Sequence, residues 1–122
     1  MSLTSGRPVK IISFSAAPDN PQADFKSIVM FGQGQIDREP CGTCTCAKMA
    51  SLFKKGRLGI GDPFLQESII GTYARATIVG TTEIEGQTAV VPEITYTVYV
   101  TGIHQFLIDE SDTLKEGYLL SA

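Results

Sequence analysis

Residues 37–50 read DREPCGTCTCAKMA. This stretch holds all three cysteines of the chain, which are Cys41, Cys44 and Cys46. The residues that follow favour a helix, and basic side chains gather near its expected end, where they complement the helix dipole. Gly56 supplies a terminator. The stretch therefore predicts one helix over residues 43–55, with the thiols at its start.

Strands are expected on both sides of this helix. Short β-branched, apolar runs predict strands at 9–14 and 27–31. Downstream of Gly59 the chain alternates and is rich in Thr, Val, Ile and Tyr, which predicts further strands at about 64–70, 73–81, 87–92, 93–101 and 103–108. A hairpin turn is expected near Gly86. The pattern predicts one α+β domain, a mostly antiparallel sheet wrapped around one principal helix.

The composition is that of a globular protein and offers little to nucleic acids. Hydrophobic residues make up 43% of the 122 residues and charged residues 19%, which suits a single domain with a core. The net charge of −3 does not favour binding to nucleic acid or to an anionic membrane surface. We therefore expect no nucleic-acid partner and no membrane association.

The cysteines also indicate a compartment. A disulfide framework spreads an even number of cysteines along a secreted chain, whereas here three lie within six residues. No stretch resembles a bilayer-spanning segment or a secretory signal. We therefore expect a cytoplasmic protein, and we expect residues 1–3 to be a cloning remnant.

Cys41 stands where a helix start would act on it. The first-turn N–H groups lack partners within the helix and the dipole is positive there, so a thiol should ionise easily and an anion could bind. Gly42 allows close approach of the backbone, Thr43 adds a hydroxyl, and Asp37 could hold a cation. These parts could hold an amino acid by both ends beside a base. Glu39 would oppose ionisation if it pointed inward.

Three other interpretations of the thiols stay open. Cys41 could simply be a small buried residue, as free cysteines commonly are. A metal site would need a fourth ligand, and the only histidine, His104, is far along the chain and is expected to be a packed strand residue. Cys41 and Cys44 could form a C-x-x-C redox pair, but no βαβ pattern is evident around them.

The segment FGQGQIDREPCGTCTCAKMA, residues 31–50, resembles the second cysteine motif of the proline racemase family. That family includes hydroxyproline epimerases and trans-3-hydroxyproline dehydratases. Its motif runs Asp-Arg-Ser-Pro-Cys-Gly-Thr-Gly-Thr. The flanking segments, such as LFKKGRLGIGDPFLQESIIGT and VVPEITYTVYVTG, are also similar to the family, so the resemblance covers nearly the whole chain.

This resemblance implies a fold and a mechanism. The fold is that of diaminopimelate epimerase, in which two similar α/β domains clamp the substrate. Two cysteines, one per domain, exchange a proton at the substrate α-carbon without cofactor or metal. By resemblance Cys41 is the second catalytic cysteine, Asp37 holds the ring nitrogen, and Gly42 and Thr43 cradle the carboxylate. Phe31 would line the ring pocket, which favours proline over a hydroxylated ring.

The chain departs from the family pattern at three points. Glu39 replaces a serine, Cys44 replaces a glycine of the cradle, and the first catalytic cysteine of a Met-Cys-Gly-His-like motif is absent. We therefore expect residues 4–122 to be the single C-terminal domain of a two-domain racemase whose N-terminal domain is missing. Such a fragment should be inactive alone, and its uncovered apolar face could drive formation of a homodimer.

The resemblance leaves the substrate undecided. Dehydratases of the family are expected to carry Thr or Ser in place of Cys41, so a racemase or epimerase is favoured. The alternatives are a 4-hydroxyproline 2-epimerase and a noncatalytic thiol module that binds ligand or metal.

Overall fold

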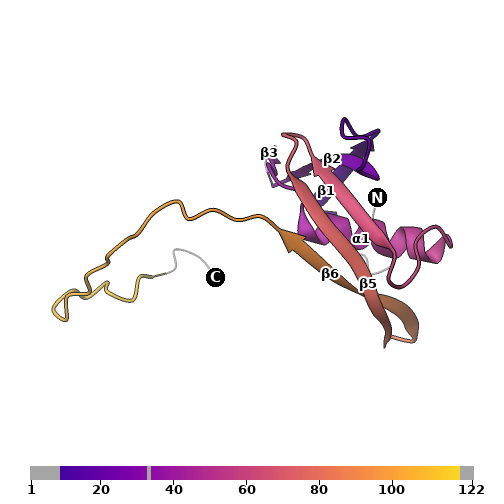
Figure 1. Ribbon diagram of the computed structural model, residues 1–122. Coiled ribbons are helices and arrows are strands. Elements are labelled where there is room, and N and C mark those ends of the chain that lie inside the picture. The colour runs from indigo at the N-terminus through magenta and orange to yellow at the C-terminus, as the bar shows by residue number, and fades with distance from the viewer. Residues whose placement is uncertain (1–8, 33, 119–122) are drawn as a thin grey trace.

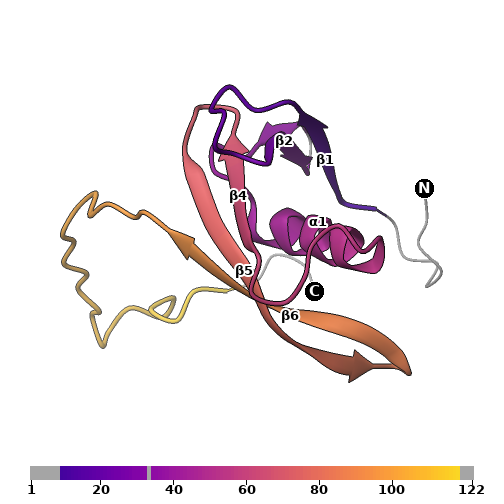
Figure 2. The ribbon, with the colours of Figure 1, turned by 45° about the vertical axis from the view of Figure 1, so that its right-hand side comes forward.

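The computed structural model describes residues 9–32 and 34–118 and consists of one curved sheet and one helix (Figure 1). The expected cloning remnant at 1–3 lies outside these residues. The elements are β1 (Ile11–Ala16), β2 (Phe25–Phe31), β3 (Gln35–Ile36), α1 (Gly42–Lys54), β4 (Pro63–Ser68), β5 (Tyr73–Ile84) and β6 (Gln87–Tyr96). The strand order is β1-β2-β4-β5-β6, with β3 paired to β2. Figure 2 shows the sheet curving around α1, as the predicted α+β fold requires.

Helix α1 is a crossover between two parallel strands. The register pairs Phe25 with Gln66 and Ser27 with Ser68, so β2 and β4 run parallel, while the other strand pairs are antiparallel. Parallel neighbours need such a long connection, which α1 provides. The prediction that no βαβ pattern surrounds the thiols was therefore wrong. The two strands are far apart in sequence and share a short contact, so no local pattern reveals the pairing.

The helix begins and ends within one residue of its predicted bounds. It buries Thr45, Met49 and Leu52, whose spacing of four and then three residues places them on one face. Ala47 is exposed because it falls on the opposite face. The N–H of Gly56 donates to the Phe53 carbonyl at 2.9 Å, and its φ of +65° ends the helix as predicted.

The hydrophobic core lies between α1 and the concave face of the sheet. Its buried side chains are Met49, Leu52, Leu58, Phe64, Ala76 and Ile78. Partly buried residues of β2 and β6 pack against this cluster, so the helix is held from both sides of the curved sheet. Burial of this one helix face fixes the direction in which the start of α1 points. Within the described residues, no helix is long and apolar enough to cross a membrane.

A buried carboxylate ties the loop before β2 to the sheet. Glu67 of β4 is 2% exposed. Its Oε2 accepts the backbone N–H groups of Asp19 and Asn20 at 3.0 and 3.1 Å. Its Oε1 lies 3.7 Å from the Lys26 ammonium, which also pairs with Asp19. Because these partners satisfy the buried charge, the parallel junction that α1 bridges is well defined.

The β5–β6 hairpin confirms the turn predicted near Gly86. Glu85 and Gly86 both have positive φ, at 51° and 72°, which is the backbone of a two-residue type I′ turn. β6 continues unbroken through Pro92, so the predicted separate strands at 87–92 and 93–101 were wrong. Pro92 is tolerated because β6 is an edge strand and a register shift lies opposite it, between Ile78 and Gly80.

The chain leaves the sheet after β6 and extends away from the body (Figure 1). The strand predicted at 103–108 was therefore wrong, as was the packed position predicted for His104. His104 is exposed and stacks on Phe106, with ring centroids 6.2 Å apart. The segment has strand-like alternation, but a strand also needs a neighbour to accept its hydrogen bonds, and 97–108 pairs with no other strand in the described part of the chain.

Candidate active site at the start of helix α1

Cys41 occupies the N-cap position of α1. It has extended backbone angles, φ −52° and ψ 124°, and its carbonyl accepts the Thr45 N–H at 2.8 Å. Pro40 before it is fully buried, which fixes the entry of the chain into the helix. Among the residues that the structure describes, no side chain caps the first turn and no acidic residue lies within it. The first-turn N–H groups can therefore bind an anion.

The three thiols are free and half-buried. The pKa of Cys44 is raised to about 11, mainly by burial and in addition by a side-chain interaction with Cys41 and by the charges of Cys41 and Asp37. Burial also raises the pKa of Cys46, with a contribution from Cys41. Cys44 and Cys46 therefore stay protonated at neutral pH. The structure brings Cys41, Cys44 and Asp37 into one site.

Asp37 reaches this site from the turn after β3. Its N–H donates to the Val29 carbonyl at 2.9 Å, and its Oδ1 accepts the Glu39 N–H at 3.3 Å. This local turn fixes the half-buried carboxylate just before the helix. An ammonium group could bind the second oxygen, Oδ2. Glu39 itself is exposed, although its charge contributes to raising the pKa of Tyr96.

Two hydroxyl groups that the sequence did not indicate also face the helix start. A Cβ placed on Gly42 would lie 3.3 Å from Tyr96 Oη, so this tyrosine approaches the backbone closely. Tyr96 Oη and Thr45 Oγ1 are both buried without a hydrogen-bond partner in the described residues. Burial raises the pKa of Tyr96, and the charges of Cys46 and Cys41 add to this. Thr45 lowers the pKa of Tyr96, but Thr45 Oγ1 and Tyr96 Oη do not meet in hydrogen-bonding geometry.

The reasons why these hydroxyls were missed differ. Thr45 lies on the inward face of α1, which the spacing to Met49 and Leu52 could have revealed. Tyr96 reaches the helix because β6 ends beside it, and that position depends on the pairing of β5 with β6. No local feature of the sequence around Tyr96 carries this information.

The remaining predicted site residues, Thr43 and Phe31, lie at the exposed edge of the site. Thr43 is exposed in the first turn of α1. Phe31 ends β2, pairs with Ile11 and Gln35, and is 38% exposed, so its ring remains accessible. Cys41, Gly42 and Thr43 are consecutive, and Asp37 joins them through its turn. Phe31 belongs to the adjoining β2–β3 hairpin.

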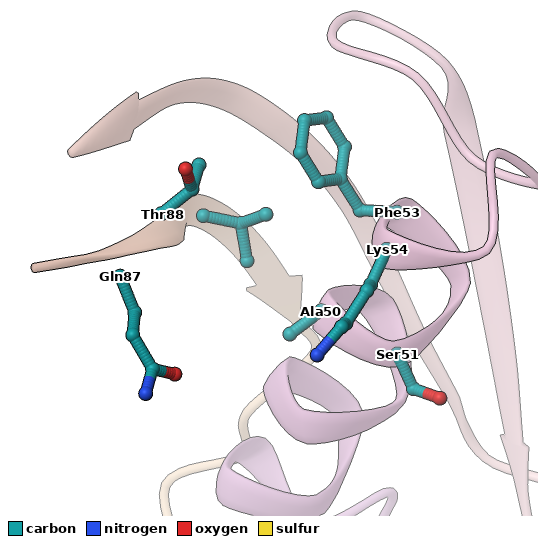
Figure 3. A pocket seen from close by; sticks show the side chains of 7 residues that line it. Ala50, Ser51, Phe53, Lys54, Gln87 and Thr88 are labelled. Carbon is teal, nitrogen blue, oxygen red and sulfur yellow. The ribbon is translucent and has the colours of Figure 1, made fainter. Parts of the chain in front are cut away.

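Cavities lie near both ends of the helix. A cleft of about 250 Å³ near its start is lined by Glu39, Pro40, Arg75, Tyr96 and neighbouring residues of β5 and β6. A larger groove, of about 870 Å³, lies between the second half of α1 and β6 (Figure 3). Its lining residues are Ala50, Ser51, Phe53, Lys54, Gln87, Thr88 and Val90. Lys54 is the one titratable side chain among them. The groups suited to proton transfer therefore lie at the start of α1, near the smaller cleft.

In the described part of the chain, no three His, Cys, Asp or Glu side chains come together as a group that could hold a metal ion. His104, the histidine we considered as a fourth ligand, lies in the extended segment after β6.

Comparison with known proteins places this chain in a family. The family model described as proline racemase matches residues 2–119. The proline racemase of Clostridioides difficile is 47% identical over 112 residues, which cover 92% of this chain and 33% of that protein. A trans-3-hydroxy-L-proline dehydratase from Bacillus thuringiensis subsp. konkukian is 38% identical over 109 residues, covering 89% and 33%.

A solved structure supports the same family. The crystal structure of a hydroxyproline epimerase from Agrobacterium vitis, with bound trans-4-hydroxy-L-proline, matches with a TM-score of 0.72 at 36% identity. The match covers 92% of this chain and 32% of that one. The fold is thus one domain of the diaminopimelate epimerase-like type, and the chain spans about a third of the length of the relatives it matches. The chain belongs to the proline racemase family.

Proposed function

We propose that this chain supplies one proton-transferring half of a cofactor-independent racemase that acts on proline. The observation that carries the proposal is the position of Cys41, a free thiol at the uncapped start of a helix. The first-turn N–H groups would bind an anion, and the neighbouring carboxylate of Asp37 would bind a cation. The 47% identity to a protein named as a proline racemase supports the choice of substrate.

The geometry suits removal of a proton beside a carboxylate. The first-turn N–H groups, beginning at Gly42 and Thr43, would hold the substrate carboxylate, and Asp37 would hold the ring ammonium. Both contacts stabilise the negative charge that develops on the α-carbon. The Cys41 thiolate would take the α-proton and become a thiol. A second thiol would give a proton to the opposite face, leaving the enantiomer and a thiolate.

That second thiol must come from outside this site. Cys44 and Cys46 follow Cys41 by three and five positions at the start of the same helix, so they approach the substrate from the same side as Cys41. A proton donor for the opposite face needs a different structural element. We therefore propose that the remaining part of a longer protein supplies it and that the isolated 122-residue chain does not racemise proline.

A second substrate is favoured by one comparison. The solved hydroxyproline epimerase of Agrobacterium vitis matches this chain with a TM-score of 0.72 at 36% identity. Epimerisation of 4-hydroxyproline is therefore the alternative activity. Dehydration is less favoured, because the family's dehydratases are expected to carry Thr or Ser in place of Cys41.

A chimaeric enzyme tests the proposal. This chain would replace the matching third of the Clostridioides difficile proline racemase, and chiral chromatography would follow conversion of L-proline and of trans-4-hydroxy-L-proline. We expect the chimaera to racemise proline and the isolated chain to leave it unchanged. A folded chimaera without activity on either amino acid, or an isolated chain with ordinary enzymatic turnover, would contradict the proposal.

The compartment and the assembly state are proposed on other grounds. All three thiols are free, which fits a reducing compartment such as the cytoplasm. Many large apolar side chains are exposed, including Phe14 of the edge strand β1 at 57% and Ile103 at 98%. Such surfaces favour association, so the isolated chain should form a homodimer at high concentration, which sedimentation analysis can detect.

A further inference from the structure

Cys41 and Cys44 occupy neighbouring positions at the start of α1. Helix α1 begins at Gly42, so Cys41 is the N-cap and Cys44 is the third residue of the helix. Side chains at these two positions face each other, which is why they contact in a capping box. In this chain both positions carry half-buried thiols. Cys41 also contributes to raising the pKa of Cys44, as expected for two neighbouring thiols.

The surrounding topology is that of a dithiol site. The pair lies at the start of a helix that crosses between the parallel strands β2 and β4. A C-x-x-C pair at the start of a helix in a βαβ unit is the typical arrangement of a redox-active dithiol. The sequence alone argued against this, because the pairing of β2 with β4 was not visible in it.

We propose that Cys41 and Cys44 form a reversible disulfide when the protein meets a peroxide. The Cys41 thiolate attacks one oxygen of hydrogen peroxide, which yields a sulfenic acid on Cys41 and hydroxide, and hydroxide takes up the thiol proton as water. The Cys44 sulfur then attacks the Cys41 sulfur, its proton leaves with the displaced hydroxyl as a second water, and the disulfide forms. Two thiols lose two electrons and one peroxide gains them.

Cys46 is not a competing partner for this bond. It follows Cys44 by two positions and Cys41 by five, whereas facing positions on a helix are three or four apart. A disulfide brings Cβ atoms to about 3.8 Å, which the first turn can reach by tightening slightly from the usual spacing of about 5–6 Å between facing positions. The bond depends only on the position of the thiols and not on the substrate proposed above. It would nevertheless block Cys41 as a base.

The experiment uses the reduced 122-residue chain treated with hydrogen peroxide and then with an alkylating agent. We expect the number of reactive thiols to fall from three to one, with a mass loss of about 2 Da before alkylation. Fragmentation of the peptide that holds the three cysteines should place the bond between Cys41 and Cys44. Dithiothreitol should restore all three thiols.

Two variants complete the test. Cys46→Ser is the matched control and should form the same disulfide, losing both remaining thiols. Cys44→Ser should form no intramolecular bond, and its Cys41 should proceed to sulfinic acid or to an intermolecular disulfide. The proposal is contradicted if the oxidised wild-type protein has a disulfide that includes Cys46, if it keeps three reactive thiols, or if it carries only sulfinic acid. The wild-type mapping decides the matter even if a variant fails to fold.

Discussion

The two ends of helix α1 differ in size and in chemistry. The C-terminal half borders the larger groove, of about 870 Å³, whose lining offers one titratable group, Lys54. The start borders a cleft of about 250 Å³ and carries Cys41, uncapped N–H groups and the carboxylate of Asp37 nearby. Cavity size alone therefore does not locate the reactive groups. The direction of the helix dipole and the residues at its positive end do so.

The largest effect should come from Cys41→Ser in the chimaeric enzyme. Loss of a general base commonly costs about 10²–10⁴-fold in rate, so racemisation of L-proline should fall by that amount. The matched control at the other end of α1 is Lys54→Ala, which should keep the rate within about twofold because Lys54 lies in the groove. Equal losses of racemisation rate in Cys41→Ser and Lys54→Ala would show that proton transfer does not depend specifically on the start of α1.

The two ends share one buried support. Met49 is fully buried in the middle of α1, so Met49→Ala should lower the free energy of unfolding by about 2–5 kcal/mol through lost contacts and a cavity. Urea denaturation followed by circular dichroism measures this change. Ser51→Ala, on the exposed face, is the control and should shift stability by less than about 0.5 kcal/mol. An unchanged free energy of unfolding in Met49→Ala would show that packing of Met49 does not hold the helix against the sheet.

A smaller effect is expected from Asp37→Asn. The substitution keeps the side-chain shape but removes the charge that would bind the ring ammonium. A hydrogen bond to a charged group contributes about 1.5–3 kcal/mol, so kcat/KM of the chimaera should fall by about 10- to 100-fold. Steady-state kinetics on L-proline measure the change. An unchanged kcat/KM would show that another group holds the substrate amine.

The smallest effect concerns alkaline stability. The pKa of Cys44 is raised from its ordinary value of 9.0 to about 11 in the folded chain. Between these values the folded thiol keeps its proton while the unfolded one loses it, so stability is present below pH 9 and is lost as pH rises towards 11. Urea midpoints should therefore fall over this range, and Cys44→Ser should fall less. An identical decline in both proteins would contradict the assignment.

Much of the fold follows from local patterns. The bounds of α1, its glycine end and the turn at Gly86 were predicted because each depends on neighbouring residues. The parallel pairing of β2 with β4 and the course of the chain after Tyr96 were missed because both depend on distant partners. For the site, Cys41 and its neighbours were visible as a motif. The hydroxyl of Tyr96 was not, since only the folded sheet brings it to Gly42.

If Cys41 is the base, its modification should be accompanied by loss of activity. The chimaera would be treated with iodoacetamide at neutral pH, with activity and peptide mass followed over time. We expect Cys41 to be alkylated before Cys44 and Cys46, whose pKa values are raised. Activity should be lost at least as fast as Cys41 is alkylated, because the second thiol can also react, and L-proline should slow both processes. An enzyme that stays active with Cys41 fully alkylated would show that Cys41 is not the base.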